Sequence, residues 1–377
     1  DINSLEGGAG NDTFISSLGN DYIYGGNVTG TTHTDSQTTG DMADYSNSIN
    51  SSNNLVVNLS TTSSDAAGNS YSSAYVRLSS NNSSVYTDSL YGIEDITGTS
   101  NNDTLTGSNS ANTLIGNSGN DILQGLLGAD KLDGGAGDDV FIINESDITD
   151  IGNDSIIGGS GSDTINYNGI TSSGVTIDFG SGTSATVTIG SYTHTLSEVE
   201  NIIGTNQKDI LTGSESVNTI QGMGGDDSIY GQAGSDYLYG GNNQADATSS
   251  GDDYIDGKEG DDKIYGGDGK DTLYGGDGKD TLYGEAGDDS INGEAGDDTL
   301  FGGAGDDALD GGLGADIIYA GDGDDIITFE QADNKNDIVY GGTAAADSGI
   351  ETVDYSQALK GMTVTLGDGN ALGTATS

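Results

Sequence analysis

Residues 257–328 read GKEGDDKIY, GGDGKDTLY, GGDGKDTLY, GEAGDDSIN, GEAGDDTLF, GGAGDDALD, GGLGADIIY and AGDGDDIIT, eight consecutive units of nine residues without a gap. Every unit has Gly at its fourth position, Asp at its sixth, and Ile or Leu at its eighth. Self-similarity at a short fixed period is typical of a chain that stacks repeats along one axis. We therefore predict a solenoid for this stretch.

The residue types of one unit predict its local structure. Glycine at the first, second and fourth positions tolerates positive φ, so we expect a tight turn whose carbonyl oxygens point inward. Asp at the sixth position adds a carboxylate, and the last three residues form a short strand that turns its eighth residue into the core. Carbonyl and carboxylate oxygens without His or Cys favour Ca²⁺ over zinc or copper, and flexible turns favour it over Mg²⁺.

The charge of the chain requires cations if the chain is to fold. Asp and Glu number 61 and Lys and Arg 9, which gives a net charge of -52. At an effective dielectric constant near 20, two carboxylates about 5 Å apart repel each other by ~3 kcal/mol. Disorder would be the alternative, but Tyr, Ile and Leu recur at fixed intervals, which disordered acidic chains do not show. The acidity also excludes nucleic acid as a partner, and the apolar runs are too short to insert into a membrane.

The alternation of units between two sheets predicts where cations lie. Each cation would sit between one unit and the second unit after it, so the regular run would hold about six internal sites. Asp262 would then pair with Asp280, and Asp271 with Asp289. The chain has no Cys and no Pro, so stability must come from stacking and bound ions.

The units GGDGKDTLY, GEAGDDTLF and GGAGDDALD resemble the GGxGxDxUx nonapeptide of RTX (haemolysin-type) calcium-binding proteins. The resemblance implies an all-β fold, a right-handed parallel β-roll that folds when it binds several Ca²⁺ ions. It also implies export by a type I secretion system of Gram-negative bacteria, and hence a secreted, extracellular or cell-surface location.

The repeat predicts three β-roll blocks separated by inserts in which apolar and polar residues alternate. The predicted segments are 1–46, a block with a loop insertion; 47–97, a β-rich insert; 98–167, a block; 168–203, a second β-rich insert; 204–357, the main block; and 358–377, the start of a further β-rich module. Residues 1–10 already read as a repeat rather than a signal peptide, and the last module breaks off. We expect the chain to be a segment of a longer protein.

Candidate calcium ligands are the sixth-position carboxylates of all three blocks and the fourth-position glycines of the regular run. At the block starts Asn112 and Asn218 replace the sixth-position Asp, and Asn101, Ser110 and Ser216 replace the fourth-position Gly, so we expect those turns to bind Ca²⁺ poorly or not at all. The predicted ligands are Asp12, Asp21, Asp121, Asp130, Asp139, Asp154, Asp163, Asp227, Asp236, Asp253, Asp262, Asp271, Asp280, Asp289, Asp298, Asp307, Asp316 and Asp325, with Gly260, Gly269, Gly278, Gly287, Gly296 and Gly305.

Other residues admit two interpretations. Asp35, Asp246 and Asp347 lie in related loop insertions and are either extra ligands or solvated charges. An outward tyrosine row (Tyr230, Tyr239, Tyr265, Tyr274, Tyr283 and Tyr319) either stiffens a sheet or binds a partner, and the first is the commoner role. His33 and His194 have no metal spacing and are interpreted as incidental. No HExxH or GxSxG motif occurs, so no catalytic residues are assigned.

These features lead us to expect a structural segment of a large cell-surface protein, of the adhesin or surface-layer (S-layer) type, that is not an enzyme. The alternative is the calcium-binding module of a secreted enzyme or toxin. Direct binding of a glycan or of ice ranks below both. Partners besides Ca²⁺ would be copies of the chain itself or other cell-surface components.

Overall fold

The structure of the chain is a computed structural model that describes residues 4–7, 11–15, 21–25, 27–29, 32–34, 41–46, 54–64, 70–78, 84–144, 153–182, 184–189, 192–242, 251–329, 337–341 and 352–354. These residues form β-strands and turns without a helix, so none of them makes a helix that could cross a membrane. Two compact units are present: Asp1–Gly169 with Ser184–Val199, and Ile170–Thr183 with Glu200–Ser377.

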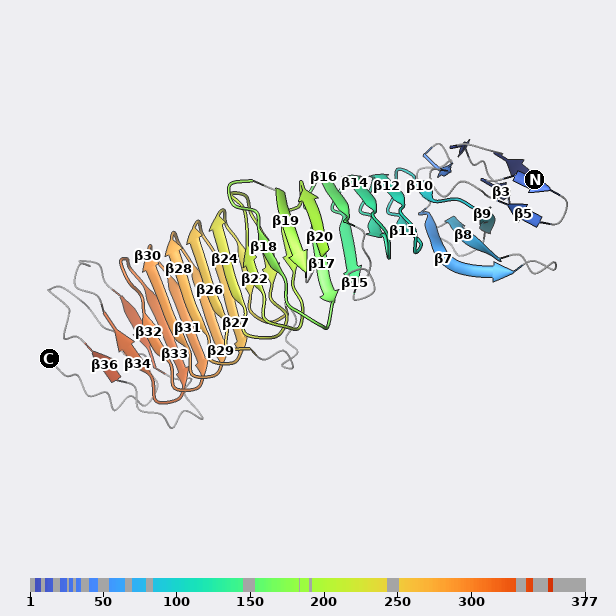
Figure 1. The fold of residues 1–377 in the computed structure, drawn as a ribbon. Helices are drawn as coiled ribbons and strands as arrows, with labels where there is room; N and C mark the ends of the chain where they lie inside the picture. Colours follow the sequence, from blue (N-terminus) through green and yellow to red (C-terminus); the bar gives the residue numbers. More distant parts are fainter. Residues whose placement is uncertain are drawn as a thin grey trace. The chain divides into compact units, whose positions relative to one another are not determined.

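The first unit holds two main sheets (blue to green in Figure 1). The strands of one, in order of pairing, are β1 (Ser4–Glu6), β3 (Tyr22–Tyr24), β9 (Ser84–Tyr91), β8 (Ser70–Leu78), β7 (Val56–Ser64), β11 (Thr104–Thr106), β13 (Ile122–Gln124), β15 (Val140–Asn144) and β17 (Thr164–Gly169). The strands of the other are β2 (Thr13–Ile15), β6 (Met42–Asp44), β10 (Asp95–Thr97), β12 (Thr113–Ser118), β14 (Lys131–Ala136), β16 (Ser155–Ser160), β20 (Tyr192–Ser197) and β19 (Ser184–Ile189).

Most of these pairs are parallel, and the antiparallel ones lie where the nine-residue period is interrupted. Antiparallel pairs join β7 to β8, β8 to β9 and β19 to β20. A further antiparallel pair joins β4 (Asn27–Thr29) to β5 (Thr32–Thr34). In the first insert both outer strands, β7 and β9, also pair with parallel neighbours, whereas in the β19–β20 hairpin only β20 does.

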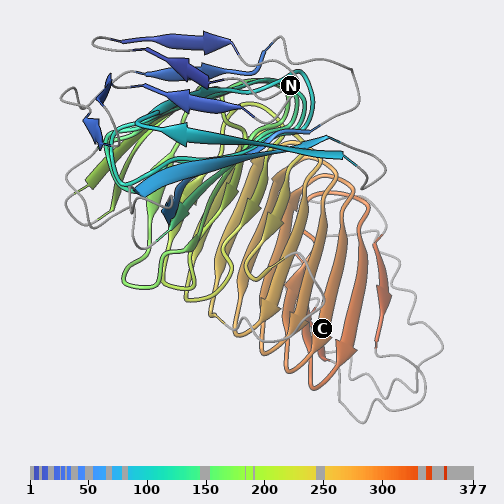
Figure 2. The same ribbon diagram turned by 90° about the vertical axis from the view of Figure 1, so that its right-hand side faces the viewer.

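The second unit alternates strictly between two parallel sheets. One contains β21 (Asn201–Ile203), β23 (Thr219–Gln221), β25 (Tyr237–Tyr239), β27 (Lys263–Asp268), β29 (Thr281–Ala286), β31 (Thr299–Ala304), β33 (Ile317–Asp322) and β35 (Ile338–Tyr340). The other contains β18 (Thr176–Asp178), β22 (Ile210–Thr212), β24 (Ser228–Ala233), β26 (Tyr254–Glu259), β28 (Thr272–Asp277), β30 (Ser290–Ala295), β32 (Ala308–Asp310), β34 (Ile326–Thr328) and β36 (Thr352–Asp354). Figure 2 shows these strands side by side, with their turns in rows.

The core of the second unit consists of the eighth-position side chains. Ile264 pairs in register with Leu282, which pairs with Leu300, and all three are buried. Because each residue of this row lies two units from the next, the predicted alternation of units between two sheets is confirmed. Burying one such side chain contributes ~1.5–3 kcal/mol. The prediction of an all-β parallel β-roll is likewise confirmed.

The strands of the regular run are longer than the sequence predicts. Most span six residues, because pairing continues from the seventh position of one unit through the third position of the next, as in β29. The tight turn is therefore confined to the fourth to sixth positions. Positive φ occurs at the second position, for example 118° at Gly267, and at the fourth, for example 150° at Gly269.

An outward aromatic row runs along the sheet that contains β27. Neighbouring rings from Tyr239 through Tyr265, Tyr283, Phe301 and Tyr319 to Tyr340 stack with centroids 4.6–4.9 Å apart and planes within 8°. On the other sheet, the rings of Tyr230, Tyr254 and Tyr274 are tilted by 46–48°. In the first row neighbouring rings cover one another's faces, an arrangement that favours the interpretation of this row as one that stiffens the sheet.

Candidate metal sites in the turns

The sixth-position aspartates form columns along the rows of turns. The main-chain N–H of each donates a hydrogen bond of 2.6–3.0 Å to Oδ1 of the column member in the next turn of its row. The columns of the first unit are Asp103, Asp121, Asp139 and Asp163, and Asn112, Asp130 and Asp154. Those of the second unit are Asp209, Asp227, Asp253, Asp271, Asp289, Asp307 and Asp325, and Asn218, Asp236, Asp262, Asp280, Asp298, Asp316 and Asp337.

Ten interior members of these columns have a second carboxylate oxygen, Oδ2, that no protein donor reaches in the described part of the chain. Among the described residues, no hydrogen-bond partner reaches the buried Oδ2 atoms of Asp121, Asp139, Asp227, Asp236, Asp262, Asp271, Asp280, Asp289, Asp298 and Asp307. A buried charged oxygen without a partner is costly, so the arrangement requires a counter-charge at Oδ2.

A small space in front of each Oδ2 is kept open by the first-position glycine. A Cβ on Gly284 would come closer than 3.0 Å both to Oδ2 of Asp289 and to the carbonyl oxygen of Gly302, two units further on. The same two kinds of oxygen converge at Gly257 and Gly266. The first-position glycine therefore serves close approach rather than positive φ, and this corrects the expectation from the sequence.

The fourth-position glycines complete the turn. At Gly278 φ is 155°, and a Cβ there would collide with the carbonyl oxygen of Gly260 in the turn two units earlier. Carbonyl oxygens thus follow one another along the row of turns beside the carboxylates. The predicted fourth-position residues Gly260, Gly269, Gly278, Gly287, Gly296 and Gly305 all have positive φ.

The electrostatics of the columns favour a cation beside the buried carboxylates. Burial raises the pKa of Asp271 to about 8, and the charges of Asp253 and Asp289 also raise this pKa. Burial likewise raises the pKa of Asp227 to about 9 and that of Asp298 to about 8. A divalent cation at Oδ2 would remove this penalty and hold the carboxylates ionised.

The donor set fits a hard cation. The described residues contain no cluster of three or more His, Cys, Asp or Glu side chains that could bind a metal by itself. Each candidate site combines one carboxylate oxygen with main-chain carbonyl oxygens of neighbouring turns, the oxygen-only environment that Ca²⁺ prefers. The residues present therefore fit calcium.

All the aspartates predicted as ligands occupy such columns or short pairs of the same kind. In these pairs the main-chain N–H of Asp12 donates to Oδ1 of Asp41, and that of Asp21 to Oδ1 of Asp88. Their role as calcium ligands remains a prediction. The predicted candidates Asp35, Asp246 and Asp347 lie outside the described residues.

The structure adds column members that the sequence interpretation leaves out: Asp41, Asp88, Asp103, Asp209 and Asp337. Asp103 and Asp209 keep the repeat spacing, being 18 residues before Asp121 and Asp227, so the period could have identified them. Asp337 follows Asp316 by 21 residues instead of the regular 18, and because of this longer spacing the nine-residue period does not identify it.

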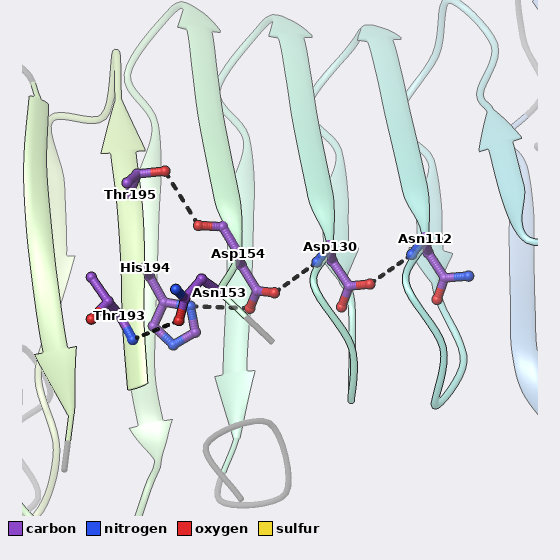
Figure 3. Close-up of polar contacts among 7 residues, drawn as sticks. All are labelled: Asn112, Asp130, Asn153, Asp154, Thr193, His194 and Thr195. Atoms are coloured by element: carbon purple, nitrogen blue, oxygen red, sulfur yellow. Dashed lines mark hydrogen bonds and ion pairs between the residues drawn. The ribbon is translucent and has the colours of Figure 1, made fainter. Parts of the chain in front are cut away.

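His194 occupies the end of one column (Figure 3). Its buried ring places Nδ1 3.0 Å from Oδ2 of Asp154, while Oδ1 of Asp154 accepts the N–H of Asp130. The interpretation of His194 as incidental therefore misses a direct contact with a predicted ligand. The side chain of His33 lies outside the described residues.

Stacked parallel strands, glycine-lined turns and carboxylate columns together define a calcium-binding parallel β-roll. The family model of the RTX calcium-binding nonapeptide repeat matches residues 1–31, 89–123, 115–142, 148–169, 212–244, 248–282, 274–309 and 301–335, more than half of the chain. The chain belongs to this family, whose repeats bind Ca²⁺ at multiple sites and are typical of secreted proteins. No curated protein sequence matches the chain.

Proposed function

We propose that this chain is a calcium-dependent structural segment of a large secreted bacterial cell-surface protein, of the adhesin or surface-layer type, and not an enzyme. The observation that carries the proposal is the row of buried Oδ2 atoms without protein donors in the columns. In a chain with a net charge of -52, the turns that contain these atoms would then depend on bound cations.

We assign the ligands of one site to two turns of a row. Oδ2 of a sixth-position Asp, such as Asp271, and the carbonyl oxygen of the first-position glycine two units after its own, Gly284, would bind the same ion, together with fourth-position carbonyls such as that of Gly269. Two turns must stack before such a site exists, so binding and folding are coupled. Calcium sites of extracellular modules have dissociation constants of ~10⁻⁴–10⁻³ M, so the chain would stay unfolded in the cytosol and fold outside the cell.

We keep the segment boundaries that the sequence predicts. Calcium would bind in segments 1–46, 98–167 and 204–357, whereas the β-rich segments 47–97 and 168–203 would fold by burying apolar side chains such as Leu59 and Val187. Calcium-loaded β-rolls of this kind would serve as stalk or lattice elements, and calcium between acidic surfaces of neighbouring copies is a physically reasonable cross-link.

Far-ultraviolet circular dichroism with and without millimolar calcium tests the folding part of the proposal. We expect most of the strand signal, that of the repeat blocks, to require calcium, and a strand signal left undiminished by full chelation would contradict the proposal. Electron microscopy of the purified chain in calcium tests the assignment to the cell surface. Sheets or filaments would support a surface layer, and isolated rods a stalk.

The second candidate function is the calcium-binding module of a secreted RTX enzyme or toxin. The same repeats support it, because the columns would serve any domain attached to them. The sequence beyond the two ends discriminates between the two functions, since a catalytic or pore-forming domain would favour the second and many more repeat modules the first.

A further inference from the structure

The first carboxylate of the main block differs from those that follow it. Oδ2 of Asp209 accepts the main-chain N–H of Thr205 at 2.6 Å, and Oδ1 lies 3.0 Å from the Thr205 hydroxyl. Oδ1 also accepts the N–H of Val175 at 2.7 Å. Asp227, the next member of the same column, has no donor to its Oδ2 among the described residues. At Asp209, protein donors thus occupy the side of the carboxylate that stays open at Asp227.

The block of the first unit begins in the same way. Oδ2 of Asp103 accepts the N–H of Thr99 at 2.6 Å, the Thr99 hydroxyl lies 3.0 Å from both carboxylate oxygens, and Oδ1 accepts the N–H of Leu55 at 2.7 Å. In both blocks, Thr replaces the second-position glycine, and the donor to Oδ1 comes from the residue before an inserted strand, β7 or β18. The same arrangement thus begins both blocks.

The second turn of each block is closed by an amide instead of a carboxylate. Oδ1 of Asn218 accepts the N–H of Ser214 at 2.7 Å, and its Nδ2 donates to the carbonyl oxygen of Glu200 at 2.7 Å. Asn112 makes the equivalent bonds, at 2.7 Å to the N–H of Ser108 and at 2.6 Å to the carbonyl oxygen of Glu94. A neutral side chain that donates as well as accepts needs no cation.

Two carboxylates at other column ends contact a polar side chain. Nδ1 of His194 lies 3.0 Å from Oδ2 of Asp154, as Figure 3 shows, and the hydroxyl of Tyr45 donates to Oδ2 of Asp88 at 2.9 Å. In each case the other oxygen, Oδ1, accepts the hydrogen bond of the column. The donor is the main-chain N–H of Asp130 for Asp154, and that of Asp21 for Asp88. Thr and Tyr thus deliver a proton donor to Oδ2 at these column ends, and His194, when protonated, places a positive charge beside Oδ2 of Asp154.

We propose that these donors take the place of calcium, so that the turns of Asp103, Asp209, Asp154 and Asp88 are metal-free caps of the calcium-binding columns. The inference rests on the proposed function, because it presumes that the interior turns bind calcium. A hydrogen-bonded carboxylate loses the oxygen that an ion would use, and it no longer requires the ion for stability. The caps keep their structure at calcium concentrations at which the interior turns are unfolded, and they present a formed turn on which the first calcium-binding turn stacks.

Counting bound calcium in the full chain by equilibrium dialysis at saturating calcium tests the caps. The cap variant carries Asp103→Asn, Asp154→Asn and Asp209→Asn, and the matched control carries the same change at their column neighbours, Asp121→Asn, Asp130→Asn and Asp227→Asn. We expect the cap variant to bind as many ions as the wild type, and the control to lose about one ion per substituted turn. A cap variant that loses as many ions as the control would overturn the inference. A wild type that binds no calcium would contradict the proposed function, and the inference with it.

Hydrogen exchange of the unsubstituted chain in chelator tests the caps without any variant. We expect peptides that cover residues 95–118 and 201–221 to exchange at least tenfold more slowly than peptides from residues 257–328. Exchange at one uniform rate across both regions would overturn the inference.

Discussion

The main-chain N–H of Asp262 donates a 2.7 Å hydrogen bond to Oδ1 of Asp280, eighteen residues later. This bond fixes the carboxylate of one turn against the backbone of the turn before it in the same row. Oδ2 of Asp280 is therefore held in place before an ion arrives, which lowers the entropy that binding must remove. Because the bond repeats along the column, each turn supports the next, and calcium binding is expected to be cooperative.

Removing one interior carboxylate should weaken calcium-driven folding. In Asp280→Asn the side chain keeps an acceptor for Asp262 but loses the charged Oδ2, so we expect the calcium concentration at half-folding to rise about tenfold, equivalent to ~1.4 kcal/mol. The control is Asp277→Asn, which removes an exposed charge from the third position of the same unit. Circular dichroism during a calcium titration measures both, and equal midpoints for the two variants would count against the assignment of Oδ2.

Filling the space in front of one carboxylate should have a similar effect. A Cβ in Gly266→Ala would come closer than 3.0 Å to Oδ2 of Asp271, although φ at this glycine is not in the left-handed region. We expect a several-fold loss of calcium affinity in titration calorimetry. Lys270→Ala, at an exposed position of the same turn, should not weaken binding. Unchanged affinity in the alanine variant of Gly266 would show that the space is not part of a site.

Backbone strain at a second position offers a stabilising change. Glu285 has φ of 76°, a conformation that glycine adopts at no steric cost, and it pairs with Gly267 and Gly303, both glycines with positive φ. We expect Glu285→Gly to stabilise the calcium-loaded chain by about 1 kcal/mol against urea, relative to Glu285→Gln, which removes the charge alone. A glycine variant no more stable than the glutamine variant would refute the presence of strain.

The aromatic row should contribute to stability through its rings. Tyr283 is stacked between Tyr265 at 4.7 Å and Phe301 at 4.6 Å. We expect Tyr283→Ala to lower the free energy of unfolding by about 2 kcal/mol, since each aromatic pair contributes ~0.5–1.5 kcal/mol beyond area burial. Tyr283→Phe keeps the ring and should stay close to the wild type. If both variants lose the same stability in urea, the hydroxyl rather than stacking matters.

The regular run is predictable from sequence because each nine-residue unit has the same residue types at the same positions. Ile264 and Leu282 lie at the eighth position and pair as that spacing requires, and the column bond from Asp262 to Asp280 follows from the same period. The six-residue strands were not predicted, since pairing through the first to third positions depends on the stacked neighbour and not on the unit itself.

The column ends could not be predicted from the period. His194 reaches Asp154 because the parallel pairing of β20 with β16 places Thr195 beside Ser155, and the register of an inserted strand is not encoded in the nonapeptide. The Tyr45 contact with Asp88 likewise joins residues 43 positions apart across an insert. By contrast, the threonine at the second position of a unit, as in Thr205, is a local sign that sequence alone could have supplied.

Anomalous X-ray diffraction from crystals of the chain grown in millimolar calcium tests the central claim most directly. We expect density peaks about 2.3–2.6 Å from Oδ2 of interior column members such as Asp271 and Asp280, with carbonyl oxygens of the neighbouring turns completing the coordination. We expect no peak at Oδ2 of Asp209, which already accepts the N–H of Thr205. Calcium peaks that avoid the columns, or a folded chain without any calcium peak, would contradict the central claim.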